Sequence, residues 1–209
     1  MDYLQQVALA AGLAWASGLR LYALLFVLGL IHRMDWFTLP PSLAVLSDPL
    51  VLGASGFMLW VEFFADKIPG FDSLWDAVHT FIRIPGGALL AAGAMADQNS
   101  AIAIAAAILG GTIAGGTHFT KAGSRALINT SPEPISNWTA SFAEDAAVAG
   151  GLWFMFQYPL VFLALLLVFL LLCAWLIPKL WRAIKGVVAR IRDLLRGDVR
   201  IRTTGYPRP

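Results

Sequence analysis

The amino-acid sequence predicts an all-α polytopic membrane protein with about six transmembrane helices. Of its 209 residues, 58% are hydrophobic and only 13% are charged, and the mean hydropathy is +0.71. A typical soluble domain carries about 25% charged residues. Apolar runs of about 20 residues recur along the chain without strict alternation, which favours membrane-spanning helices over the strands of a barrel.

The apolar runs define six predicted spans, at residues 4–31, 49–66, 72–95, 100–119, 138–155 and 158–178. The third, fourth and fifth contain more Ala, Gly and polar residues than the others, so we expect them to face protein rather than lipid. The single cysteine, Cys173, lies inside the last run, where a small buried apolar residue is expected.

The charge distribution predicts the orientation. The stretch after Pro178 holds nine Lys and Arg residues against Asp193 and Asp198. The positive-inside rule therefore places this end in the cytoplasm, and six spans place the N-terminus there too. Together with the family resemblance given below, this predicts a multi-pass protein of the bacterial inner membrane.

The chain is expected to consist of a transmembrane domain, residues 1–178, and a cytoplasmic basic tail, residues 179–209. Within the tail, residues 179–196 alternate apolar and basic side chains at helical spacing. This pattern is typical of an amphipathic helix that lies on the membrane surface and binds anionic lipid. The apolar positions are Leu180, Trp181, Ile184, Val187, Val188, Ile191, Leu194 and Leu195.

Two short matches suggest an inverted repeat of three plus three helices, residues 4–95 and 100–178. The segment 17–20 (SGLR) resembles 122–125 (AGSR), and Pro49 and Pro132 are each followed 13 residues later by an acid, Glu62 and Asp145. Repeats with an odd number of spans run in opposite directions, as in many secondary transporters.

The third span carries a stripe of ionisable residues. Asp72, Asp76, His79 and Arg83 are spaced four, three and four apart, which aligns them on one helical face. A single Arg or Asp at the centre of a span costs about 2.5–3.5 kcal/mol. We therefore expect the stripe to face a polar cavity or partner charges.

A helix break is predicted directly after this stripe, at Pro85, Gly86 and Gly87. Proline removes a backbone donor, and glycine lowers helix propensity. A new half-helix starting here would point its positive end toward an anionic group beside Arg83.

Other spans supply partners for the stripe, and six acids nearly balance five bases within the spans. Arg20 lies mid-span, Glu62 shares a face with Ser55 and Asp66, and Glu144 shares one with Asn137 and Ser141. Such a set predicts either a solute pathway or ion pairs that only hold the helices in register. The predicted pathway consists of Arg20, Glu62, Asp76, His79, Arg83, Glu144 and Asp145.

The glycine-rich segment 110–116 of the fourth span predicts close helix packing, within the chain or between copies in a homo-oligomer. The sequence has no nucleotide-binding loop, zinc-protease or serine-hydrolase motif. We expect no enzyme activity, no catalytic residue, no cofactor and no metal. The basic tail is better placed for lipid than for nucleic acid.

Several segments resemble a bacterial membrane family known as domain of unknown function 4126. They are Ser17-Gly18-x-Arg20, Lys67-Ile68-Pro69, the stretch from Asp72 to Gly87, and Ser131-Pro132-Glu133-Pro134. The resemblance covers about residues 8–155 and implies a polytopic membrane fold. It implies no activity and no site residues.

The sequence therefore favours a transporter or channel for an ion or a small polar solute. The arginines favour an anion, and a histidine beside carboxylates suggests proton coupling. The alternative is a non-transporting membrane scaffold or lipid-binding protein whose buried charges are structural and whose basic tail is the working surface.

Overall fold

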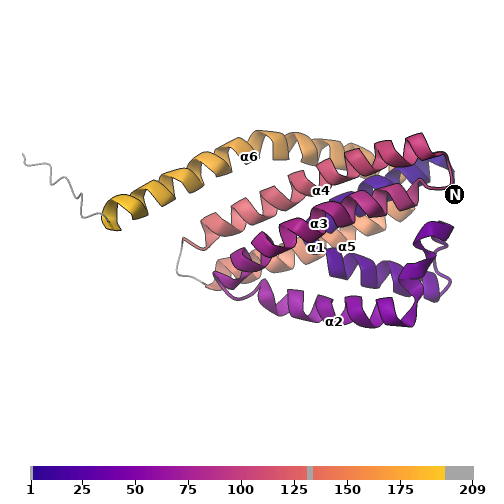
Figure 1. The fold of residues 1–209 in the computed structure, drawn as a ribbon, viewed down its shortest axis with the longest axis horizontal. Coiled ribbons are helices and arrows are strands. Elements are labelled where there is room, and N and C mark those ends of the chain that lie inside the picture. Colours follow the sequence, from indigo (N-terminus) through magenta and orange to yellow (C-terminus); the bar gives the residue numbers. More distant parts are fainter. Residues whose placement is uncertain (1, 131–133, 196–209) are drawn as a thin grey trace, which may run out of the picture.

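The computed structural model describes residues 2–130 and 134–195, and every regular element in this part of the chain is helical (Figure 1). The all-α prediction is therefore confirmed. The elements are α1 Tyr3–Arg33, the 3-10 helix η1 Pro41–Ser47, α2 Pro49–Ala65, α3 Phe71–Ala94, α4 Ser100–Ile128, α5 Pro134–Gln157 and α6 Pro159–Leu195.

Local sequence signals set where several helices begin. The side chains of Asp2, Asp48 and Asn99 accept hydrogen bonds from backbone amides in the first turns of α1, α2 and α4, at 2.7, 2.8 and 2.9 Å. These are N-caps, which satisfy amides that lack an intrahelical partner. Gly70 precedes α3 with a φ of +82°, a conformation that glycine adopts without strain.

Helix α1 is interrupted at Arg20, whose backbone is non-helical (φ −143°, ψ 72°). Before this residue, Gly12 contacts Met155 of α5, and after it Phe37 packs on Phe156 with ring centroids 4.4 Å apart. Arg20 itself meets α5 about ten residues earlier, between Ser141 and Asp145. The chain therefore runs halfway along α5, turns at Arg20 and returns.

Contacts at the two ends of α1 agree with this path. Gln98, in the α3–α4 loop, donates to Gln6 at 2.5 Å, and Ser42, beyond the end of α1, donates to the carbonyl of Gly93 at 2.5 Å. A straight helix of 31 residues would be about 46 Å long and would keep these ends far apart. Residues 3–19 and 21–33, the first and second halves of α1, thus form a re-entrant helical hairpin.

The hairpin changes the predicted topology. Residues 2–6, 34–48, 95–99 and 158 share one end of the bundle, here called the proximal end. The α2–α3 loop, the end of α4 and the last turns of α6 lie at the distal end (Figure 1). The start of α1 is proximal and the last turns of α6 are distal, so these two segments lie at opposite ends of the bundle, whereas six complete spans would place them at the same end (Figure 1).

The prediction of six complete spans is not confirmed. By length and apolarity, the candidate spans among the described residues are α1, α4 and α6, and η1 with α2 would be one further span bent by 66°. Helix α1 qualifies by composition but does not pass through the bundle. Its inner face forms the core, where Leu9, Leu13 and Ala14 are almost completely buried.

Helix α3 is continuous from Phe71 to Ala94, so the break predicted at Pro85, Gly86 and Gly87 does not occur. Gly87 instead allows close packing: a Cβ there would lie 2.4 Å from Ser17 Oγ and 2.5 Å from Ala114 Cβ. The predicted close packing of segment 110–116 likewise occurs within the chain, because Gly110 faces Ala91 of α3.

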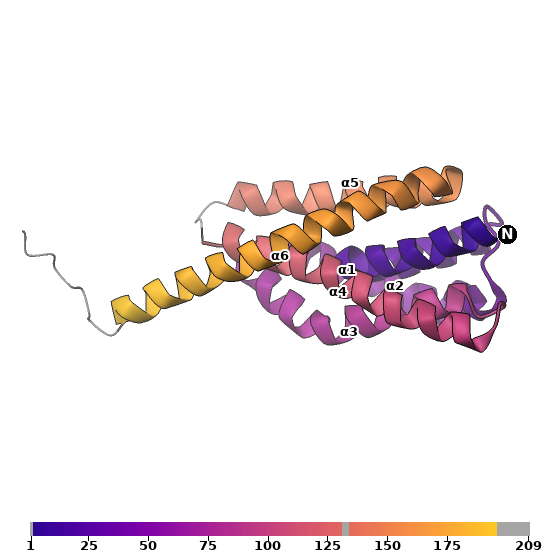
Figure 2. The same ribbon diagram turned by 90° about the horizontal axis from the view of Figure 1, so that it is seen from above.

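Helix α6 also continues through its proline, Pro178, and runs obliquely past the bundle so that its last turns project beyond it (Figure 2). Residues 179–195 are therefore part of α6 and not a separate element, while residues 196–209 of the predicted tail lie outside the described part. Leu180 is buried against Gly123 of α4.

The first members of the predicted repeat differ. Helix α1 folds back at Arg20, whereas α4 is one continuous helix from Ser100 to Ile128. The second match of the repeat, at Ser131 and Pro132, lies outside the described residues.

Candidate functional site

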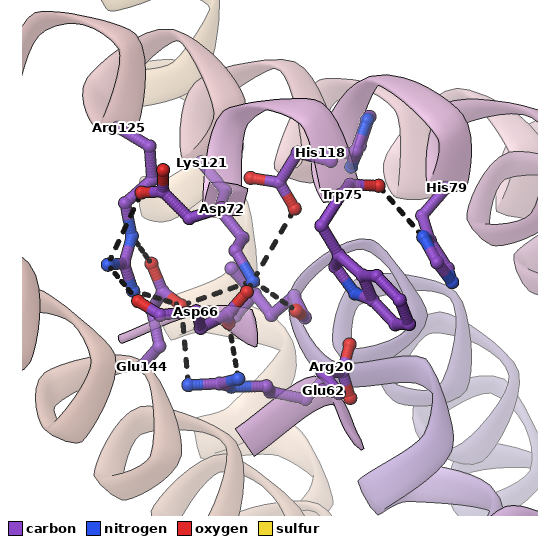
Figure 3. Close-up of polar contacts among 12 residues, drawn as sticks. Arg20, Glu62, Asp66, Asp72, Trp75, His79, His118, Lys121, Arg125 and Glu144 are labelled. Carbon is purple, nitrogen blue, oxygen red and sulfur yellow. Dashed lines mark hydrogen bonds and ion pairs between the residues drawn. The ribbon is translucent and has the colours of Figure 1, made fainter. Parts of the chain in front are cut away.

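A cluster of buried charged side chains fills the distal half of the bundle, around the tip of the α1 hairpin (Figure 3). Five of the helices contribute to it. We call the following ten residues the charge network: Arg20, Glu62, Asp66, Asp72, Asp76, Arg83, Lys121, Arg125, Glu144 and Asp145.

Arg83 of α3 is closed into a three-residue ion pair. It contacts Glu62 of α2 and Asp76, two turns earlier on α3, both at 2.6 Å, and all three side chains are 0% exposed. Each partner neutralises part of a charge that the membrane interior would otherwise exclude. This triad joins α2 to α3, which otherwise share few contacts.

Arg20, at the turn of the α1 hairpin, binds acidic residues from two other segments. It contacts Asp66 after α2, and Asp145 and Glu144 of α5 at 2.9 and 3.7 Å. It also donates to the hydroxyl of Ser141 at 2.8 Å, and its own side chain is only 2% exposed. One guanidinium therefore faces three carboxylates.

Lys121 of α4 lies directly beneath the hairpin. Its ammonium donates to the backbone carbonyl of Leu19 at 3.1 Å and to Asp66 at 2.8 Å, with Glu144 at 3.3 Å and Asp76 at 3.7 Å. Leu19 ends the first half of α1, where carbonyls lose their intrahelical partners. Lys121 thus supplies both a hydrogen bond and a positive charge at a helix C-terminus.

Arg125, one turn further along α4, extends the network toward the distal end. It contacts Glu144 at 3.0 Å and donates to the carbonyl of Asn137 at 2.9 Å. Asp72 lies 4.0 Å from it and accepts from Asn129 at 2.6 Å. The network therefore links mid-bundle Arg20 to polar residues at the α4–α5 connection.

Asp66 belongs to the turn between α2 and α3. Burial alone would raise its pKa, but Lys121 and Arg20 outweigh burial and lower it from 3.8 to about 2. Lys67 beside it donates to Ser141 at 3.4 Å and lies 3.1 Å from the centroid of the Phe63 ring. With Lys67 included, five cationic side chains face six carboxylates, so the fully ionised cluster carries one excess negative charge.

The two histidines of this region lie at the edge of the network. His79 stacks on Trp75, with ring centroids 4.0 Å apart, and its Nε2 lies 3.1 Å from the hydroxyl of Tyr22. His118 lies 2.7 Å from Thr80 and 3.5 Å from Arg83. Within residues 2–130 and 134–195, no group of three or more His, Cys, Asp or Glu side chains is arranged to hold a metal ion.

A cavity of about 510 Å³ lies between the second half of α1 and α5. It is partly open along its length, it begins at Trp36 and Gln157 at the proximal end, and its walls are mostly apolar. Arg20 and Asp145 form its inner end. The cavity therefore leads from one end of the bundle to the tip of the hairpin, where the charge network begins.

The structure divides the residues of the predicted pathway. Arg20 and Asp145 line the cavity, and Glu144 lies next to Arg20. Glu62, Asp76 and Arg83 form the closed triad, and His79 lies beside it without joining an ion pair. Buried acids and bases thus pair with one another, which is one of the two arrangements that the sequence allowed.

Sequence reasoning gave Asp66, Lys121 and Arg125 no place in the pathway, because each lies near the end of a predicted span, where a charged side chain can reach the interface. The structure instead places them at the centre of the network. The balance of charges could have identified them, since each deeply buried acid needs a buried base as its partner.

Residues 7–179 match the family described as domain of unknown function (DUF4126). The chain belongs to this family. The DUF4126 match includes all ten residues of the charge network and ends at Lys179, so that the last turns of α6 lie beyond it. The search of curated proteins and the search of solved structures found no match.

Proposed function

We propose that this DUF4126 protein is a membrane transporter or channel for an ion or small solute, with the α1 hairpin at the centre of its pathway. One observation carries the proposal: the cavity from the proximal end ends at Arg20 and Asp145, which are paired with the network that continues to the distal end. A charged route thus continues where the cavity stops.

The physical cost of the hairpin supports this proposal. A helix that ends inside a membrane leaves backbone groups without partners, and such breaks are tolerated only where protein or a water-filled cavity surrounds them. Transporters use interrupted helices of this kind to place charged groups at mid-membrane depth. Here the break is at Arg20, and Lys121 binds the exposed carbonyl of Leu19.

We infer that α2–α6 cross the bacterial inner membrane and that α1 enters and returns from the outside. The projecting turns of α6 carry Lys179, Arg182 and Lys185, which favours a cytoplasmic distal end. The proximal loops carry Asp35, Asp48 and Asp97 against Arg33, as expected outside. A fusion reporter at each end of the chain should therefore give opposite locations, and equal locations would contradict the topology.

The two ion-paired groups have different roles in this proposal. The Arg83 triad is a brace, because it is fully buried and has no face on the cavity. Arg20 and Asp145 form the gate, because both line the cavity and the Asp145 side chain is 37% exposed.

The test records charge movement by the purified protein in liposomes adsorbed on a solid-supported membrane, after jumps of pH, Na⁺, K⁺ or Cl⁻. We expect a current that empty liposomes lack and that Arg20→Gln and Asp145→Asn both reduce at least tenfold. Arg33→Gln is the matched control, because Arg33 is exposed and bonds only to the carbonyl of Ser47 at 3.3 Å. A silent wild type, or full current in both gate variants, would refute the proposal.

A second candidate function, a lipid-binding scaffold, is favoured by α6. Lys179 lies 3.1 Å from the centroid of the Trp175 ring and Lys185 lies 5.0 Å from that of Trp181. Aromatic and cationic side chains together are typical of a membrane interface with anionic lipid. If this surface is the functional one, Lys179→Ala with Lys185→Ala should reduce co-purified phosphatidylglycerol, while Arg20→Gln should change neither lipid content nor any current.

A further inference from the structure

The cavity between the second half of α1 and α5 differs from an ordinary ion pathway in its walls. Val27 and Ile31 line one side and Leu152 and Phe156 the other, and the charged groups are confined to its inner end. A small hydrated ion gains nothing from such walls, because apolar surface does not replace its hydration shell. An apolar molecule with one charged group matches this distribution.

The inner end of the cavity presents a negative group rather than a positive one. Arg20 faces Asp66, Glu144 and Asp145, and its side chain is only 2% exposed. The side chain of Asp145 is 37% exposed, and one of its oxygens, Oδ1, lies 2.9 Å from Arg20 Nε. Asp145 lines the cavity, and no hydrogen bond or ion pair of its other oxygen is seen among the described residues.

The surrounding charge has the same sign. The ten-residue network and Lys67 together hold six carboxylates and five cationic groups. An incoming cation therefore brings the cluster to neutrality, whereas an anion would add to an existing excess. In a low-dielectric interior this difference is large enough to select the sign of a ligand.

Aromatic side chains line the proximal part of the cavity. They are Trp36, Trp153, Phe37 and Phe156, and the ring centroids of the last two lie 4.4 Å apart. Aromatic faces attract cations, and aromatic cages are a common binding site for quaternary ammonium groups. The aromatic rings at the proximal end of the cavity and the Asp145 carboxylate at its other end thus both favour a cation.

We propose that this cavity binds a hydrophobic organic cation, with its positive group on Asp145 and its apolar body between α1 and α5. The proposal rests on the proposed transport function for the direction of entry, from the proximal end, but binding itself does not depend on transport.

The experiment compares two probes of nearly equal size and opposite charge, tetraphenylphosphonium and tetraphenylborate, by calorimetry with the full-length protein in detergent. We expect tetraphenylphosphonium to bind, and Asp145→Asn to weaken it about tenfold or more. Asp97→Asn is the matched control, because Asp97 lies at the proximal end outside this cavity. Ala149→Phe fills the cavity without a change of charge and should abolish binding.

Three results of the binding experiment would overturn the proposal. Stronger binding of tetraphenylborate that survives Asp145→Asn would show an anion site at Arg20. If Asp97→Asn weakens the binding of tetraphenylphosphonium as much as Asp145→Asn does, the effect comes from surface charge. If both probes still bind to the Ala149→Phe protein, they bind outside the cavity, for example as lipid-like molecules on the outer surface. Binding without any current in liposomes would leave this inference standing and refute transport, whereas current without binding would do the reverse.

Discussion

Removal of the Arg83 side chain is the perturbation whose consequence the structure defines best. Arg83→Ala leaves the carboxylates of Glu62 and Asp76 buried, each having lost a partner at 2.6 Å. Breaking a buried ion pair by removing one member costs about 3–5 kcal/mol, because the other charge stays without compensation. Asp76 keeps the Lys121 ammonium at 3.7 Å while Glu62 loses its partner, so we expect a loss within this range, an increase in the unfolded fraction of about two to four orders of magnitude.

The assay is equilibrium unfolding in detergent micelles, followed by circular dichroism. Arg33→Ala is the control, because this exposed residue should change the free energy of unfolding by no more than about 0.5 kcal/mol. A second arm replaces the whole triad, as Glu62→Met, Asp76→Leu and Arg83→Met. Apolar replacement of a complete buried ion pair is often neutral or stabilising, so we expect this variant to regain most of the loss.

The results for Arg83→Ala and for the triple variant together test whether the triad only neutralises its own charges. A loss below about 1 kcal/mol in Arg83→Ala would mean that water or another cation reaches the acids. A triple variant that is less stable than Arg83→Ala would mean that the triad has a role beyond mutual neutralisation. Either result would refute the assignment of the triad as a brace.

Three further predictions concern single positions. Gly87→Ala should destabilise the protein by about 1–3 kcal/mol, because its Cβ would lie 2.4 Å from Ser17 Oγ, whereas Gly116→Ala, with no neighbour within 4 Å, should be neutral or slightly stabilising in the same unfolding assay. Pro85→Ala should preserve the fold and raise stability by up to about 3 kcal/mol, since α3 is continuous there; loss of folding would mean that the proline is required. The pKa of Asp66 is lower in the folded protein than its ordinary value, so its contribution to stability is present above pH 3.8 and is lost as the pH falls toward about 2. Unfolding measured over that pH range should show a steeper loss for the wild type than for Asp66→Asn.

The positions of most helices could be predicted from the sequence, because apolar run length decides where a chain can enter a membrane. The stripe from Asp72 to Arg83 was likewise readable, since residues spaced three and four apart share a helical face. Two of its members, Asp76 and Arg83, contact each other directly. Periodicity thus predicted which side chains lie on one face and that they need partners.

The fold of α1 could not be predicted in this way. The mostly apolar stretch of 28 residues from 4 to 31 is compatible with one tilted span or with two half-length helices, since both bury the same side chains. What decides between them is the contact of Arg20 with acids from α5 and from the turn after α2, which are distant in sequence. The expectation of an even number of spans, with both ends on one side, rested on α1 crossing as a single helix.

Proline marks helix starts in this chain but not helix breaks. Helices α2, α5 and α6 begin at Pro49, Pro134 and Pro159. Both Pro85 and Pro178 lie inside continuous helices, whereas the one non-helical residue within α1 is Arg20. In a membrane, neighbouring helices can compensate for the hydrogen bond that a proline removes, and the close packing at Gly87 holds α3 against α1 and α4. Local propensity is thus outweighed by tertiary packing.

The charge network and the hairpin of α1 depend on each other. A helix that ends at mid-membrane depth needs a donor for its last carbonyls, and Lys121 supplies one to Leu19. A buried ammonium in turn needs acids, which Asp66 and Glu144 provide, and these acids also bind Arg20 at the turn. Each charged group in this series is the partner of the next. A single substitution within it should therefore disturb the hairpin as well as the network. Asp145 differs from the other members of the network because its side chain is partly exposed. It is therefore the network residue best placed to exchange a protein partner for a ligand.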